Sequence, residues 1–164
     1  MSPRASAVVF AGIVCVAVVA WHRWSSGEER EIRRRLDSLI DEVNASALAD
    51  GRAARAVTIA SYFTEDVLVD LGRGFAPISG RVMLTEIISR LQPRTAAFKV
   101  NLEDVGARVA PDRESAEVSL TAELLWRGTT SRDQTLDARE FALDMRKDAG
   151  EWRISRVTAV DTLK

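Results

Sequence analysis

The sequence predicts an α+β domain in which a curved antiparallel sheet is wrapped by three helices, preceded by one transmembrane helix. Apolar residues recur at three- and four-residue steps in the first half of the domain and alternate with polar residues in the second half. An uncharged apolar run precedes both halves. A chain of 164 residues is long enough for one core but not for two full domains. We therefore expect an anchor at residues 1–24, a linker at 25–27 and one domain at 28–164.

The apolar run extends from Ala5 to Trp21 and contains no charged residue. Its length is near the minimum for a helix that crosses a bilayer, and Arg23 and Trp24 after it suit the headgroup region. A secretory signal cleaved after Ala20 is the alternative, although no polar segment precedes that position. We expect a single-pass membrane anchor. Basic residues flank the run on both sides, so the side of the membrane that carries the domain stays open.

Helices are expected in the first half of the domain. The first follows residues 25–27 and presents an arginine-rich outer face. The second covers about Arg52 to Phe63, and the third covers about Arg81 to Leu91, where Pro93 ends it. Their apolar positions lie on one helix face: Ile32, Leu36, Leu39, Ile40, Val43 and Leu48 in the first, Val57, Ile59, Ala60 and Phe63 in the second, and Met83, Leu84, Ile87, Ile88 and Leu91 in the third.

Strands are expected from about Val67 to Leu71 and throughout the second half. The parity of the apolar residues changes near Asp104, which predicts a β-bulge there. In the last strand, strict alternation would bring Arg156 and Thr158 to the same face as the core residues Trp152 and Ile154. The strands of the second half are marked by three alternating sets, Ala116 to Trp126, Phe141 to Met145, and Trp152 to Val160.

Two stretches carry a family resemblance: Tyr62-Phe63-Thr64-Glu65-Asp66-Val67-Leu68-Val69-Asp70 followed by Ile78-Ser79-Gly80-Arg81, and Phe141 to Met145 followed by Gly150-Glu151-Trp152-Arg153-Ile154. With the order of elements from Glu28 to Thr162, they resemble the nuclear transport factor 2-like superfamily. That superfamily includes the ketosteroid isomerases and the SnoaL-like polyketide cyclases. The resemblance implies a cone-like barrel with an apolar cavity, a fold that serves enzymes, ligand binders and protein-interaction modules alike.

Ketosteroid isomerases use one Asp as a base, and a Tyr with a protonated Asp as an oxyanion hole. When the chain is aligned at Ile78-Ser79-Gly80-Arg81, the base position falls on Leu71 and the second Asp position on Leu143. The first helix contains no Tyr. Asp70 is one residue away from the base position, and in a strand it would face the other side. We therefore expect a non-catalytic module that binds a protein partner or a small apolar ligand. The alternative is an isomerase, cyclase or hydratase that acts on an apolar cyclic substrate with Asp70 as its base.

Other chemistry finds little support in the sequence. His22 is the only histidine and Cys15 the only cysteine, so a catalytic triad in the domain, a His-rich zinc site and an internal disulfide are excluded. A net charge of -1 gives no basic field for nucleic acid. The acids Glu65, Asp66 and Asp70 are read as turn and solvated strand residues rather than metal ligands. We expect no cofactor and no metal.

Residues that could line a pocket are Tyr62, Leu71, Trp126, Leu143, Arg156 and Thr158. Arg156 could bind an anionic ligand, but pairing with an acid at the rim of the sheet is the preferred interpretation. Tyr62 could place its hydroxyl in a cavity, although core packing is preferred. The basic run at residues 33–35 is interpreted as a solvated helix face, or as a contact with anionic lipid. The sheet face could join two copies or a larger membrane complex.

Overall fold

The structure is a computed structural model that describes residues 27–45, 52–90, 97–127 and 134–160. Three helices are present in these ranges, as predicted: a first helix at residues 27–45, α2 at Arg52–Ala60 and α3 at Arg81–Arg90. The strands are β1 (Phe63–Asp70), β2 (Ile78–Ser79), β3 (Ala97–Val109), β4 (Ser115–Arg127), β5 (Gln134–Asp148) and β6 (Glu151–Ala159).

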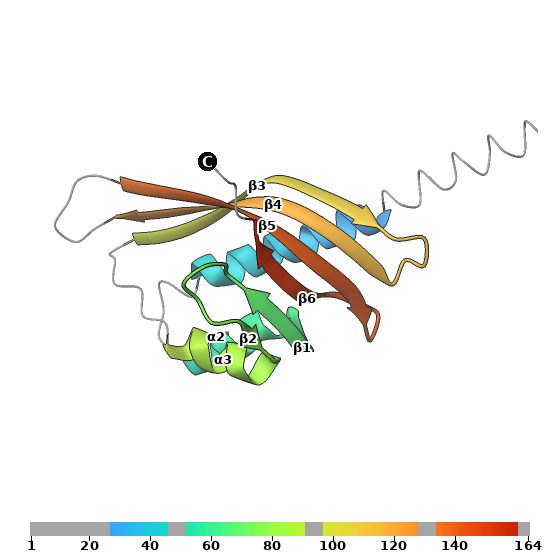
Figure 1. The fold of residues 1–164 in the computed structure, drawn as a ribbon, viewed down its shortest axis with the longest axis horizontal. Helices are drawn as coiled ribbons and strands as arrows, with labels where there is room; N and C mark the ends of the chain where they lie inside the picture. Colours follow the sequence, from blue (N-terminus) through green and yellow to red (C-terminus); the bar gives the residue numbers. More distant parts are fainter. Residues whose placement is uncertain (1–26, 46–51, 91–96, 128–133, 161–164) are drawn as a thin grey trace, which may run out of the picture.

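The six strands form one sheet in the order β2-β1-β6-β5-β4-β3 (Figure 1). The sheet is mixed, so the prediction of a purely antiparallel sheet was wrong. Strand β1 pairs in parallel with β6, while the other neighbours are antiparallel. The alternation of residues reveals which segments are strands, but it does not reveal that the last strand returns beside the first. The two-residue strand β2 pairs with β1, and no alternating pattern in the sequence indicates it.

The core lies between the three helices and one face of the sheet, which we call the inner face. The first helix contributes Ile32, Leu36 and Leu39, as its periodicity predicted. Val57 and Met83, predicted as apolar positions of the second and third helices, are instead 62% and 50% exposed. Leu48 and Leu91 lie outside the described residues. The sheet contributes Val67, Val69, Ala116, Val118, Leu120, Leu143, Met145, Trp152 and Ile154 to this core.

Two bulges interrupt the alternation of the long strands. The predicted one is confirmed: the register between β3 and β4 shifts between Glu103 and Gly106, where Asp104 has a φ of 52°. A second bulge was not predicted. Met145 is opposite Ile154, whereas the preceding residue, Asp144, is opposite Arg156. Residue 155 is therefore extra, and the faces of β6 switch after it.

The second bulge reverses the prediction for the end of β6. Val157 packs against the core opposite Leu143, and so continues the inner face after Ile154. Arg156 and Thr158 lie on the opposite face of the sheet, which we call the outer face. The expectation that strict alternation would bring both to the core side was wrong, because one inserted residue turns every later side chain over.

The start of the first helix is held on the β5–β6 hairpin by Glu28. The Glu28 carboxylate accepts hydrogen bonds from Lys147 Nζ at 2.9 Å and from Trp152 Nε1 at 3.0 Å. The hydrogen bond from Lys147 is the main cause that lowers the pKa of Glu28 below its usual value of 4.5. Further along the helix, Arg35 pairs with Glu151 at 3.1 Å. The direction of this helix is thus fixed relative to the sheet.

None of the described helices is long and apolar enough to cross a membrane. The segment from Ala5 to Trp21, for which an anchor was predicted, lies outside the described residues.

Candidate functional site

Asp70 ends β1 and is positioned by the turn that follows it. Its Oδ1 accepts a hydrogen bond from the main-chain amide of Gly72 at 2.9 Å, and the φ of 81° at Gly72 suits a glycine in this turn. The preceding residue, Val69, is buried and lies opposite Val157, while Asp70 lies opposite Thr158. Because Val69 and Val157 face the core, Asp70 and Thr158 lie on the outer face.

The two other positions that matter for an isomerase are occupied by leucines in contact with the core. Leu143 is buried in β5, with 6% of its surface exposed, and Leu71 is partly buried against the same cluster. Neither can exchange a proton. The carboxylate of Asp70 therefore does not share the inner face with them, and it is held by a local turn rather than by a second catalytic group.

Tyr62 lies in the turn between α2 and β1. The guanidinium of Arg35 stacks over its ring, 4.4 Å from the centroid. The main-chain carbonyl of Tyr62 accepts a hydrogen bond from the amide of Ile154 at 2.9 Å. Its partly buried ring packs against the core. These contacts give Tyr62 a structural role at the point where the first helix, β1 and β6 meet.

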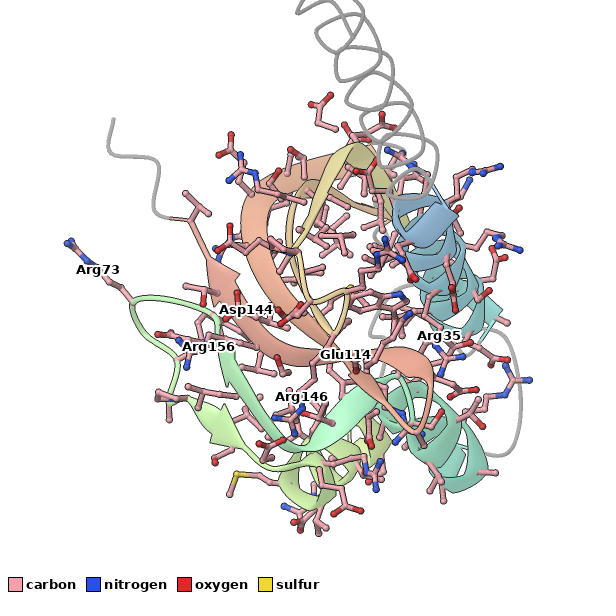
Figure 2. All side chains as sticks on the ribbon, turned by 90° about the vertical axis from the view of Figure 1, so that its right-hand side faces the viewer. Arg35, Arg73, Glu114, Asp144, Arg146 and Arg156 are labelled. Atoms are coloured by element: carbon pink, nitrogen blue, oxygen red, sulfur yellow. The ribbon has the colours of Figure 1, made fainter. Side chains whose placement is uncertain are left out.

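Arg156 forms a pair with Asp144 on the neighbouring strand, with 3.7 Å between Nε and Oδ2 (Figure 2). Both side chains are more than half exposed. This is the pairing with an acid that the sequence favoured, and a pair of this kind contributes little to stability. Trp126 belongs to β4, but its side chain lies outside what the structure describes.

Glu65, Asp66 and Asp70 are not brought together as metal ligands. Glu65 pairs with Arg81 at 3.0 Å, Asp66 pairs with Arg146, and Asp70 accepts the amide of the turn. Within the described ranges, no group of three or more His, Cys, Asp or Glu side chains could hold a metal ion. The acids of β1 therefore serve three separate local contacts.

Pockets open at two places on the surface formed by the described residues. The first has a volume of about 370 Å³ and lies where β1 and β6 end. Of the proposed residues whose side chains the structure describes, Leu71 alone lines it. The charged residues around it, on β5 and in the loop after β1, were not singled out, because nothing in their local pattern distinguishes them from solvated residues. Among the described residues, the lining is Leu71, Arg73, Thr121, Ala138, Arg139, Glu140, Ala159 and Val160.

The second pocket, of about 390 Å³, lies between the first helix and the β5–β6 hairpin. Two arginines of the basic run at residues 33–35 line it, namely Arg34 and Arg35. The third, Arg33, donates a hydrogen bond to the main-chain carbonyl of Val105 at 2.5 Å. Arg33 and Arg34 are exposed, as expected of a solvated helix face, while Arg33 and Arg35 in addition attach the helix to the sheet.

Comparison with known proteins agrees with this architecture. The family model described as a SnoaL-like domain matches residues 43–158. No curated protein matches the chain. A proposed scytalone dehydratase from Novosphingobium aromaticivorans is similar in structure, with a TM-score of 0.70, 16% identity, and coverage of 85% of this chain and 87% of that one.

Two further structures from the same organism are similar. One, described as a proposed aromatic ring hydroxylase, has a TM-score of 0.67 and 15% identity. The match covers 84% of this chain and 91% of that chain. The other is a nuclear transport factor 2-like protein with a cystatin-like fold, with a TM-score of 0.70, 14% identity, and coverage of 88% and 90%. At these identities the likeness shows the fold alone.

Proposed function

The chain belongs to the SnoaL-like domain family, and from this premise we propose that it is a non-catalytic module that binds a protein partner or a small apolar ligand while tied to a membrane. The placement of Asp70 carries this proposal. A general base must come within hydrogen-bond reach of the proton that it removes. The Asp70 carboxylate instead lies on the outer face and accepts the Gly72 amide, while Leu71 and Leu143 contact the core.

The membrane part of the proposal rests on the apolar run from Ala5 to Trp21. The first helix is described from residue 27, and six residues of extended chain reach about 20 Å at most. If the run lies in a bilayer, the helix must therefore begin close to the membrane surface. Glu28 and Arg35 fix this helix on the sheet, so the whole domain would be held close to the membrane surface together with the helix.

The outer face is a second part of the proposal, since a sheet face could join two copies or a larger membrane complex. Its charges already pair with one another, as in Arg108 with Glu117 and Arg156 with Asp144. A partner on this face would therefore meet a polar surface and exchange these ion pairs for new ones, rather than cover an apolar patch.

The experiment is to solubilise membranes that contain the intact protein in mild detergent, purify it and examine it by native mass spectrometry. The proposal predicts either a protein partner at fixed stoichiometry or one co-purifying small molecule. The matched control lacks residues 1–24 and should be recovered outside the membrane fraction. An intact protein that stays in the soluble fraction would contradict the tether. A protein that carries neither partner nor ligand would contradict the binding role.

An enzyme is the second candidate, and the descriptions of two similar structures, a proposed scytalone dehydratase and a proposed aromatic ring hydroxylase, favour it. In that case Asp70 would act as base on an apolar cyclic substrate. Incubation of the purified protein with a small-molecule extract, followed by mass spectrometry, tests this. Consumption of one compound by the native protein but not by Asp70→Asn would establish the enzyme. Asp137→Asn, which changes an exposed acid on β5, serves as the control.

A further inference from the structure

We draw no further inference here: the strongest candidate, the exposed apolar side chains of Phe75 in the loop before β2 and of Val82 and Met83 in the first turn of α3, carries no proposal, because nothing in the structure shows what covers them.

Discussion

Asn44 satisfies both main-chain hydrogen-bonding groups of Val100. Its Nδ2 donates to the Val100 carbonyl at 2.9 Å, and its Oδ1 accepts the Val100 amide at 2.7 Å. Val100 lies in β3, the edge strand of the sheet. An uncovered edge strand invites pairing with other chains. The first helix lies along this edge, and from the same helix Arg33 donates a hydrogen bond to the main-chain carbonyl of Val105. Contacts from the first helix therefore satisfy main-chain groups of the β3 edge.

Replacing Asn44 by Ala tests this cover. The substitution leaves a partly buried amide and carbonyl of Val100 without these partners, so we expect a loss of about 1–3 kcal/mol in the free energy of unfolding, measured by urea titration. Asn101→Ala, on the next residue of β3, should cost less than about 0.5 kcal/mol. Equal losses for the two variants would show that Asn44 does not secure the edge.

Glu28→Gln tests the attachment of the first helix, through its dependence on pH. The hydrogen bond from Lys147, together with that from Trp152, lowers the pKa of Glu28 in the folded state. The charged form therefore adds stability above the ordinary pKa of about 4.5, and this stability is lost as the pH falls through the lower folded value. We expect Glu28→Gln to cost about 0.5–1 kcal/mol near pH 7, with the difference shrinking below pH 4.5. Glu29→Gln, at an exposed neighbour, is the control; a pH-independent cost at residue 28 would contradict the assignment.

Arg35→Ala is expected to destabilise the protein more than Arg34→Ala. Arg35 stacks over Tyr62 and pairs with Glu151, with its side chain 27% exposed, whereas Arg34 is exposed on the helix surface. Loss of the stack and the ion pair should cost about 1–2 kcal/mol, and the exposed arginine less than about 0.5 kcal/mol. Thermal unfolding of both variants decides the matter. If Arg34→Ala proves the costlier change, the contacts of Arg35 do not hold the helix.

The bulge at residue 155 predicts which residue of β6 matters for stability. Val157→Ala removes two methyl groups from a side chain packed on the core and should cost about 1–2 kcal/mol. Arg156→Ala breaks only an exposed pair and should cost less than about 0.5 kcal/mol. Chemical denaturation measures both. The opposite order would mean that strict alternation holds and that Arg156 faces the core.

The sequence predicted the parts of the fold that leave a local pattern. The bulge at Asp104 was found because apolar residues stand on both sides of it with opposite parity, from Leu102 to Val105. The bulge at residue 155 left no such sign. Trp152, Ile154 and Val160 share one parity, and Val157 is an apolar residue on the other parity. Alternation could not decide between these two registers.

The local pattern of residues could not predict which side chains the site residues contact, for a different reason. The sequence placed Asp70 one residue from the expected base position, and it favoured pairing of Arg156 with an acid. It could not identify Asp144 as that acid, because the choice depends on which strands become neighbours and in what register. The parallel pairing of β1 with β6 could not be predicted for the same reason, because all the other strands of the sheet lie between these two in the sequence.

The central claim is that Asp70 holds a turn and does not act on a substrate. The most direct test compares small molecules and proteins that co-purify with the native protein and with Asp70→Asn, both isolated from membranes and examined by native mass spectrometry. Asparagine keeps the oxygen that accepts the Gly72 amide but cannot serve as a base. We predict identical bound species at identical occupancy in the two proteins. A small molecule that is retained by Asp70→Asn alone, as an unconverted substrate would be, would contradict this account.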